Sequence, residues 1–250
     1  MSVSIPHPPR ISPRENRLLA ALPDDDFARL QQSMTLTGLP LGAVLYESGS
    51  QMRDVYFPVS GLVSLLYTLA DGGSAEIAVV GNDGCVGIAI LLGGGTTPSR
   101  AVVQIEGYAY KIASDTLLAE FHKNVQVQQL LLRYIQSLMT QMAQTAVCNR
   151  HHTVEQQLCR WLLLSLDRVP DNRVNMTQEL ISQMLGVRRV GVTGAARKLQ
   201  EAGLIEYSRG HITVPDRAKL EAHACECYSV VKRETDRLSP PPEGGAVISA

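Results

Sequence analysis

The sequence predicts an α+β protein built in series from an antiparallel β domain, a long helix and a small helical domain that ends in a hairpin. Three observations support this order. Short apolar runs separated by glycine-rich turns fill residues 34–113, and apolar residues three to four positions apart fill residues 124–149. Two short amphipathic helices and a hairpin signal follow in residues 176–214. A chain of 250 residues is long enough for two domains with cores of their own.

The composition is that of an ordinary globular protein. Hydrophobic residues make up 45% of the chain and charged residues 19%, which argues against disorder of the whole chain. No run of eighteen apolar residues occurs and the N-terminus lacks the apolar core of a signal peptide, so we expect a cytoplasmic protein with no membrane span. The five cysteines are odd in number and irregularly spaced, which favours reduced thiols over a disulfide framework.

The first predicted domain covers residues 14–123. Two short helices are expected at residues 16–22 and 24–32, with Pro23 between them. Several short strands bounded by turn residues then indicate an antiparallel sandwich or barrel. The predicted strands are residues 43–45, 55–57, 62–68, 76–80, 101–105 and 109–112.

A long helix is predicted for residues 124–149. One apolar stripe follows the period of a coiled-coil seam, and a second apolar face lies beside it. The helix therefore either lies on its own barrel alone, or packs one face on the barrel and the other on a second copy of the chain. The stripe contains Val127, Leu131, Tyr134, Leu138, Gln141 or Met142, and Thr145, and the second face contains Leu130, Leu132, Ile135 and Met139. We expect a hinge near residues 148–151.

The last predicted domain covers residues 150–238 and contains a helix–turn–helix. It begins with a helix over residues 152–167 and closes with a helix over residues 216–238, after which residues 239–250 are expected to be a disordered tail. In between, Thr177 is the expected N-cap of a first short helix, and Gly186 is the expected turn that ends it.

The second helix of the pair is expected to end at Gly203 and to be followed by two strands at residues 204–207 and 211–214. Helix, glycine turn, helix and hairpin form the outline of a winged helix–turn–helix, whose second helix enters the DNA major groove. The apolar residues predicted to face inward are Leu180, Ile181, Met184 and Leu185 in the first helix, and Val190, Ala195, Ala196 and Leu199 in the second.

The charge of this segment supports that outline. Residues 186–211 carry five basic and two acidic residues, a surplus of three in a chain whose net charge is −1. A local basic face on a nearly neutral protein is typical of phosphate binding. The basic residues are Arg188, Arg189, Arg197, Lys198 and Arg209.

At the turn Leu185-Gly186-Val187-Arg188-Arg189, and at Tyr56-Phe57-Pro58-Val59-Ser60-Gly61, the chain resembles the Crp/Fnr superfamily of bacterial transcription regulators. The resemblance covers roughly residues 15–215. It implies a jelly-roll effector domain, a dimerisation helix and a winged helix–turn–helix. It also implies a homodimer that binds double-stranded DNA at an inverted-repeat operator, and RNA polymerase as a partner.

The resemblance implies roles for individual residues. Arg189 falls where a groove-reading arginine begins the recognition helix, so we expect it to contact a base edge, most readily guanine. Where many members carry a glutamate and a second arginine, this chain has Val190 and Gly194, so their familiar half-site is not carried over. Glycines 191 and 194 either allow close approach to DNA or are merely tolerated. The expected phosphate contacts are Arg188, Thr193, Arg197, Ser208, Arg209 and His211.

The effector is not identified by the sequence. Cyclic-nucleotide-binding members use a glutamate and an arginine–serine pair, but here the matching stretches are Gly87-Ile88-Ala89 and Pro98-Ser99-Arg100-Ala101. Isoleucine replaces the carboxylate and the pair is in reversed order, so we expect an effector other than cyclic AMP. Arg100 stays a candidate phosphate ligand if the loop shifts its register. The candidate effector-binding residues are Gly87, Ser99 and Arg100. An apolar ligand, or none, fits equally well.

The sequence predicts no cofactor, metal site or enzyme activity. Cysteine ligands of an iron–sulfur sensor are expected near the N-terminus, but none of the five cysteines precedes Cys85. One residue separates Cys225 from Cys227, which does not match zinc-finger spacing, so packing and a thiol redox role remain open for this pair. The adjacent His151 and His152 point apart. GxSxG, HExxH and GxxxxGK[ST] motifs are absent. The alternatives are a ligand-binding module with a vestigial helix–turn–helix and a small-molecule enzyme on the barrel.

Overall fold

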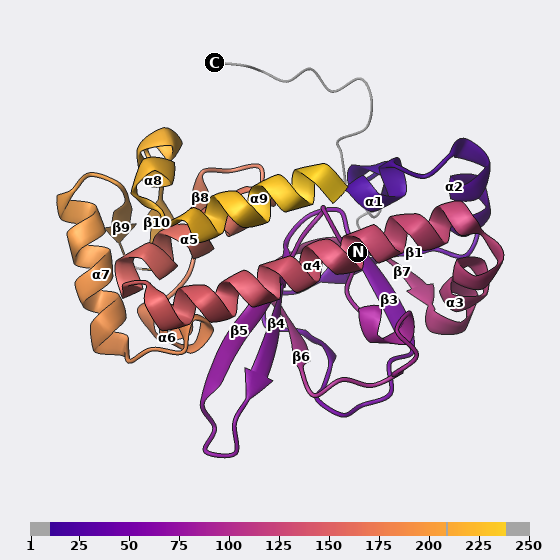
Figure 1. Cartoon of the computed structure of the whole chain (residues 1–250), viewed down its shortest axis with the longest axis horizontal. Coiled ribbons are helices and arrows are strands. Elements are labelled where there is room, and N and C mark those ends of the chain that lie inside the picture. The colour runs from indigo at the N-terminus through magenta and orange to yellow at the C-terminus, as the bar shows by residue number, and fades with distance from the viewer. Residues whose placement is uncertain (1–10, 209, 239–250) are drawn as a thin grey trace, which may run out of the picture.

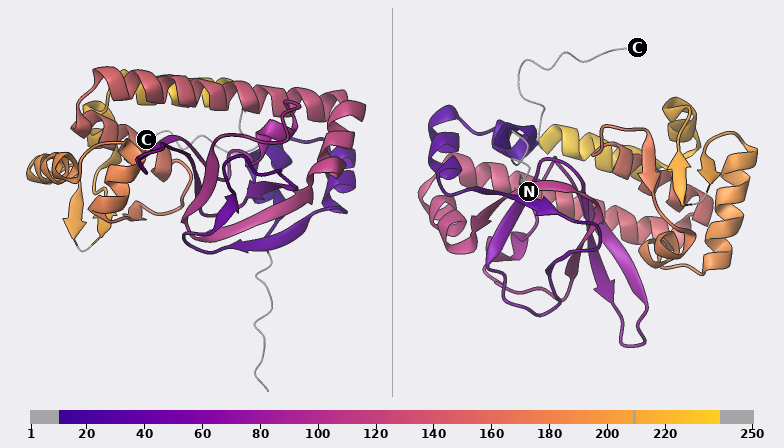
Figure 2. Two further views of the ribbon diagram at one scale, coloured as in Figure 1. Left: turned by 90° about the horizontal axis from the view of Figure 1, so that it is seen from below. Right: turned by 180° about the vertical axis from the view of Figure 1, so that it is seen from behind.

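The computed structural model describes residues 11–208 and 210–238 and confirms the predicted fold class (Figure 1). A β domain lies at one end of the molecule and a winged helix–turn–helix domain at the other. The long helix α4 (Val125–His151) runs along both of them. Figure 2 shows this helix lying across one side of the β domain.

Three short helical segments precede the β domain: the 3₁₀ turn η1 (Pro13–Glu15), α1 (Arg17–Ala20) and α2 (Asp24–Gln31). Asn16 holds them on the barrel. Its side-chain oxygen accepts hydrogen bonds from the backbone N–H groups of Leu18 and Leu19. Its amide nitrogen donates to the carbonyl oxygens of Pro58 and Gly84, both at 2.8 Å. This fully buried asparagine is therefore a helix cap and a tertiary contact at once.

The β domain consists of two antiparallel sheets that enclose the first hydrophobic core. The strand orders are β1-β7-β3 and β2-β6-β4-β5. All six predicted strands are present. The strand bounds are β1 Thr35–Leu39, β2 Val44–Tyr46, β3 Asp54–Pro58, β4 Leu62–Thr68, β5 Ser74–Val80, β6 Arg100–Ile105 and β7 Gly107–Ala113, and the 3₁₀ turn η2 is Ile88–Ile90. The sequence missed β1 because only Leu39 of that strand is buried.

The four-stranded sheet is buried on both faces. Val63, Leu65 and Val103 point into the barrel core. Leu62 and Val79 point the other way and belong to the core of the C-terminal domain. Double burial explains why β4 is apolar along most of its length instead of alternating with polar residues. The outer face of this sheet is thus the surface on which the C-terminal domain sits.

Helix α3 (Ser114–Lys123) leads into α4, whose N-cap is Asn124. The predicted seam of α4 does not face outward: Val127, Leu131 and Leu138 are buried in the barrel core. The second predicted apolar face is half buried and half exposed. Leu130 and Ile135 are buried as well, whereas Leu132 and Met139 are 45% and 61% exposed. Helix α4 therefore packs its wider apolar face on its own barrel and keeps a narrower one at the surface.

The C-terminal domain surrounds a second core around helix α5 (Val154–Leu166). Its small sheet has the strand order β8-β10-β9. Strand β8 was not predicted, because three residues with one buried side chain carry little pattern. The other bounds are β8 Arg173–Asn175, α6 Gln178–Leu185, α7 Arg189–Glu201, β9 Glu206–Ser208, β10 His211–Thr213, α8 Arg217–His223 and α9 Glu226–Leu238.

Two predicted boundaries are corrected by the structure. Helix α4 continues through the expected hinge to His151, and Thr153 starts α5 with a capping box, so the break lies at residues 152–153. The single terminal helix is in fact two helices, separated by the extended backbone of Ala224. Helix α9 then runs antiparallel to α4, with Thr235 beside Ser137 (3.0 Å). The predicted tail at residues 239–250 lies outside the described residues.

No helix within residues 11–208 and 210–238 combines the length and the apolar character needed to cross a membrane.

Candidate nucleic-acid interface

The turn between α6 and α7 has the expected local chemistry. The hydroxyl oxygen of Thr177 accepts a hydrogen bond from the N–H of Leu180 at the start of α6. Gly186 ends α6 in the left-handed conformation, with φ of 63°, where a side chain would be strained. Its N–H donates to the carbonyl oxygen of Ser182. The N-cap, the glycine turn and the reversal into α7 are therefore confirmed.

Helix α7 has one buried and one exposed face. The buried row is Val192, Ala195, Ala196 and Leu199. The prediction for Val190 was wrong: this side chain is 82% exposed, and Val192 occupies the buried position instead. Both valines fit an apolar stripe at helical spacing, and only the docking of α7 on α5 and α6 decides between them.

The outward face of α7 carries Arg188, Arg189, Thr193 and Arg197, all exposed. Figure 1 places this helix at the end of the molecule opposite α2. The N-cap side chain, that of Arg188, makes no capping hydrogen bond within the described part of the chain, so the first N–H groups of α7 are open to an anion. The result is an exposed helix of thirteen residues with positive charge along one side.

Two polar contacts fix this helix without covering that face. The Thr193 hydroxyl donates to Oε1 of Gln178 on α6, 2.7 Å away. Lys198 Nζ lies 2.5 Å from Glu155 Oε1 on α5, and this ion pair lowers the pKa of Glu155. No functional role was predicted for Gln178. Its place as the first residue of α6 is the signal that would have found it, because that turn faces the neighbouring helix.

Arg189 lies against the wing. It lines a recess together with Thr177, Gln178, Tyr207 and Gly210. The start of α7, the start of α6 and the hairpin thus converge on one surface. Tyr207 is held there by the hydrogen bond from its hydroxyl to the carbonyl oxygen of Met176 (3.1 Å).

The predicted wing residues lie at the strand ends. Ser208 and His211 are exposed and are paired in the β9–β10 register. Nδ1 of His211 is 2.7 Å from Oδ1 of Asn175 on β8, which holds the imidazole against the sheet. Arg209, also predicted to contact phosphate, lies outside the described residues. Arg188, exposed at the N-cap of α7, also borders a cleft of about 720 Å³ between α6 and the β4–β5 turn.

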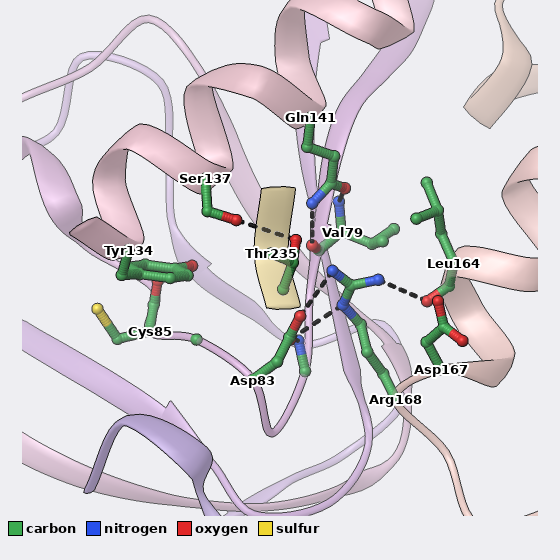
Figure 3. Close-up of polar contacts among 12 residues, drawn as sticks. Val79, Asp83, Cys85, Tyr134, Ser137, Gln141, Leu164, Asp167, Arg168 and Thr235 are labelled. Carbon is green, nitrogen blue, oxygen red and sulfur yellow. Dashed lines mark hydrogen bonds and ion pairs between the residues drawn. The ribbon is translucent and has the colours of Figure 1, made fainter. Parts of the chain in front are cut away.

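A buried polar junction sets the position of the whole domain (Figure 3). Arg168, two residues after the end of α5, pairs with Asp83 of the barrel through Nη2–Oδ2 (2.7 Å) and Nε–Oδ1 (3.0 Å). Burial alone would lower the pKa of Arg168, but the carboxylates of Asp83 and Asp167 outweigh it and raise that pKa. A Cβ on Gly81 would lie 2.6 Å from the Cβ of Arg168, so the close approach requires glycine.

The same junction includes a buried carboxylate. The Trp161 indole N–H on α5 donates to Glu76 Oε1 (2.9 Å), and the Ser64 hydroxyl donates to the other oxygen. Burial raises the pKa of Glu76 to about 7, against the lowering effect of these hydrogen bonds. Gln141 of α4 also clamps the backbone of Val79, accepting from its N–H (2.8 Å) and donating to its carbonyl oxygen (3.2 Å).

The three candidate effector residues do not gather at one cavity. Gly87, with φ of 113°, begins the 3₁₀ turn η2. Ser99 is buried, within 3.2 Å of Thr97 Oγ1 and 3.4 Å of the Tyr46 hydroxyl. Arg100 points to the outer face, pairs with Glu47 (3.3 Å) and lines the cleft beside α6. Ser99 precedes β6 and Arg100 is its first residue, so the extended chain points their side chains to opposite sides, and the effector role of these residues stays a prediction.

Three cysteines and a histidine come together where α4, α5 and α9 meet. Cys148, His152, Cys225 and Cys227 place their ligand atoms within 4.8 Å of one another. No shared role was predicted for these four residues, because 72 residues of chain lie between His152 and Cys225. The spacing of Cys148 and His152, four residues apart at the end of a helix, was the available signal.

The comparisons with known proteins agree with this geometry. Residues 37–124 match the family model for the cyclic nucleotide-binding domain, and residues 156–223 match the Crp-like helix–turn–helix domain. The two matches together span more than half of the chain. No curated protein matches the chain in sequence.

Solved structures with the same fold include transcriptional regulators of the CRP family. FixK2 from Bradyrhizobium japonicum is 17% identical with a TM-score of 0.65, covering 77% of this chain and 98% of its own. The c-di-GMP-responsive global regulator CLP from Xanthomonas campestris is 14% identical with a TM-score of 0.63, covering 77% and 99%. A CRP-family regulator from Thermus thermophilus is 19% identical with a TM-score of 0.63, covering 75% and 96%.

A β-roll joined through a long helix to a winged helix–turn–helix with an exposed basic helix defines a class of DNA-binding regulators. The chain therefore carries the two domains of the Crp/Fnr type of transcription regulator, a cyclic nucleotide-binding domain and a Crp-like helix–turn–helix domain.

Proposed function

We propose that the protein binds DNA as a homodimer and reads an inverted-repeat operator with helix α7. The observation that carries this proposal is the division of α7 into two faces. Its apolar row is buried on α5 and α6, while Arg188, Arg189 and Arg197 are held in solvent at one end of the molecule. An exposed cationic helix with a well-packed rear face suits insertion into the major groove.

Within that helix, Arg189 reads a base edge. It lies next to the wing and the start of α6, so phosphates on both sides of the groove are within reach of neighbouring groups. A bidentate contact between arginine and guanine contributes roughly 1–3 kcal/mol of discrimination. The proposed phosphate contacts, which position the protein without reading sequence, are Arg188, Thr193, Arg197, Ser208, Arg209 and His211.

The dimer is proposed to form along the exposed face of α4. Val125, Leu132 and Met139 are 61%, 45% and 61% exposed and stand seven residues apart. Ala143 and Ala146 continue the same exposed row toward the C-terminus of the helix. A heptad repeat of apolar residues on a long surface helix is the pattern of a two-stranded coiled coil. Two subunits related by a two-fold axis would place two α7 helices about 34 Å apart, one turn of DNA.

The β domain is proposed to be the effector domain, with a signal other than cyclic AMP and with no resident cofactor in it. Arg100, the candidate phosphate ligand, is paired with Glu47 on the outer face of the sheet. A regulator of this kind acts in the cytoplasm and has RNA polymerase as a further partner. Both of these assignments rest on the family.

The decisive experiment for DNA recognition is genome-wide recovery of DNA bound to the full-length protein. We expect an enriched inverted repeat with half-sites one helical turn apart, and binding to it that weakens as salt increases. Equal affinity for the recovered sites and for random duplexes would contradict the proposal. That outcome would favour a ligand-binding module whose helix–turn–helix no longer reads DNA.

The dimer is tested separately. Replacing Leu132 and Met139 together by glutamate buries like charges in the proposed seam, and we expect monomers in sedimentation analysis. Gln126→Glu is the matched control, because this exposed residue of the same helix lies outside the seam. A dimer that persists in the double variant at the wild-type concentration would place the interface elsewhere.

A further inference from the structure

A cluster of metal-ligand side chains lies at the joint between the two domains, where α4, α5 and α9 meet. Cys148 is in the last turn of α4 and His152 is the residue that ends this helix. Cys225 and Cys227 flank the first residue of α9. The three sulfur atoms and one imidazole nitrogen all lie within 4.8 Å of one another.

Two distances within the cluster match those expected around a shared ion. Cys148 Sγ and Cys225 Sγ are 3.6 Å apart, and Cys227 Sγ is 3.5 Å from His152 Nδ1. Tetrahedral zinc, with Zn–S near 2.3 Å and Zn–N near 2.0 Å, sets two thiolates about 3.7 Å apart and a thiolate and an imidazole about 3.5 Å apart. A disulfide would instead require the sulfurs at about 2.05 Å.

The surroundings are those of a closed structural site. Cys148, Cys225 and Cys227 are 0%, 6% and 1% exposed, so water has little access to the thiols. The other ring nitrogen of His152, Nε2, lies 3.4 Å from a carboxylate oxygen of Glu226. A metal-bound imidazole commonly donates its second N–H to a carboxylate, which fixes its orientation. Four ligands without an open position are typical of structural zinc, because catalytic sites keep one position for water.

The backbone is arranged to bring these residues together. The helical pattern is interrupted at Ala224, whose ψ of 156° is extended, and this break turns Cys225 toward the end of α4. Helix α9 then returns along α4 in the opposite direction, so the cluster closes one end of the helix pair. A continuous terminal helix would point Cys225 and Cys227 to different sides.

We propose that Cys148, His152, Cys225 and Cys227 bind one Zn²⁺ per chain. The ion joins the dimerisation helix, the entry to α5 and the last helix at a single point. Binding replaces the thiol protons by the metal, and the unfolded chain does not present the four ligands together. The metal therefore stabilises the orientation of the DNA-binding domain relative to α4.

The test uses the full-length protein, purified under reducing conditions without chelator. Elemental analysis should find about one zinc per chain. The metal is then exchanged for Co²⁺, which is coloured when tetrahedral. We expect a thiolate-to-cobalt charge-transfer band and intense visible absorption. Purification without zinc together with absence of these bands would overturn the proposal. So would a loss of two hydrogens in mass with a Cys148–Cys225 cross-link.

A pair of cysteine variants assigns the ligands. Cys227→Ser should lower the charge-transfer intensity by about one third, since two thiolates remain instead of three. Cys159→Ala is the matched control: Cys159 is also a buried thiol of this domain but lies outside the cluster, and its removal should leave the cobalt spectrum unchanged. An unchanged spectrum in Cys227→Ser, or a lost one in Cys159→Ala, would contradict the ligand assignment.

A measurement on the wild-type protein keeps the proposal testable if the serine variant does not fold. Stepwise blocking of thiols with an organomercurial should release one zinc as the cluster thiols react. Zinc release that does not follow thiol blocking would show that the metal is bound elsewhere and would refute the site.

Discussion

Helices α5 and α7 have the same length and lie in the same domain, yet the arginines at α5 are buried and those on the outer face of α7 are exposed. Arg160 of α5, and Arg168 two residues after the end of this helix, are 4% and 6% exposed. The first donates to Thr145 Oγ1 (3.0 Å) and the second pairs with Asp83. Arg189 and Arg197 of α7 stand in solvent, where Arg197 pairs with the exposed Glu201 on its own helix.

This difference in burial distinguishes arginines that stabilise the fold from arginines that are available to bind a ligand. Moving a guanidinium out of water is costly, so a buried one persists only when a carboxylate or other acceptors compensate it. An exposed arginine contributes little to stability. A row of exposed arginines on one helix is therefore suited to binding another molecule. Four experiments test this contrast, and they follow from the largest expected effect to the smallest.

Removal of the buried guanidinium should have the largest effect. Arg168→Ala leaves the Asp83 carboxylate buried and unpaired, and we expect a loss of about 3–5 kcal/mol in the free energy of unfolding. Denaturant unfolding measures this loss, and separation into two transitions would show that the domains come apart. Arg197→Ala is the exposed counterpart and should leave the free energy of unfolding nearly unchanged. Similar losses of stability in the two variants would contradict the distinction between buried and exposed arginines.

The buried carboxylate opposite Trp161 predicts a pH dependence. The pKa of Glu76 is about 7 in the folded protein and about 4.5 when unfolded, so the folded state binds the proton more tightly. Stability from this group is therefore complete below about pH 4.5 and is lost as the pH rises to about 7, by about 3 kcal/mol. Glu76→Gln should remove this loss. Unfolding curves of the wild type and of Glu76→Gln at pH 5 and pH 8 measure this loss. The same pH dependence of stability in both proteins would contradict the assignment to Glu76.

The exposed arginines should affect DNA binding and leave the fold intact. Arg189→Ala should lower operator affinity by about 5- to 150-fold, equivalent to 1–3 kcal/mol, and spare most binding to random duplexes. Arg197→Ala should weaken binding to both kinds of DNA and reduce the slope of log affinity against log salt by about 0.9. Fluorescence anisotropy over a range of salt concentrations measures both. Equal losses on operator and random DNA in Arg189→Ala would refute base reading by this residue.

The smallest effect concerns the two glycines of α7. Among the described residues, a Cβ on Gly194 would meet no atom within 4 Å, and one on Gly191 would meet only Val154 Cγ2 at 3.9 Å. Packing therefore requires neither glycine, and each alanine substitution should stabilise the helix by about 1 kcal/mol. Gly194 is on the exposed face, so Gly194→Ala should also weaken operator binding, whereas Gly191→Ala should not. Undiminished affinity in Gly194→Ala would mean that this glycine is merely tolerated.

Features that depend on neighbours in the sequence were predicted well. Thr177 as a cap, Gly186 as a left-handed turn, the exposed Arg189 at the start of α7 and the strand at Leu62–Thr68 all follow from local backbone preferences and short periodicities. These signals lie within a few residues of the structure they specify. The order of the parts, and the helix that meets DNA in our proposal, were therefore determined by the sequence on its own.

Features that depend on contacts between distant segments were decided only by the tertiary structure. Periodicity allows either Val190 or Val192 on the buried face of α7, and docking on α5 selects Val192. No spacing rule joins Cys148 to Cys225 or Arg168 to Asp83, because the pairs meet only after α9 returns along α4 and α5 settles on the barrel. Such contacts arise from the packing of whole elements, which local patterns constrain but do not choose.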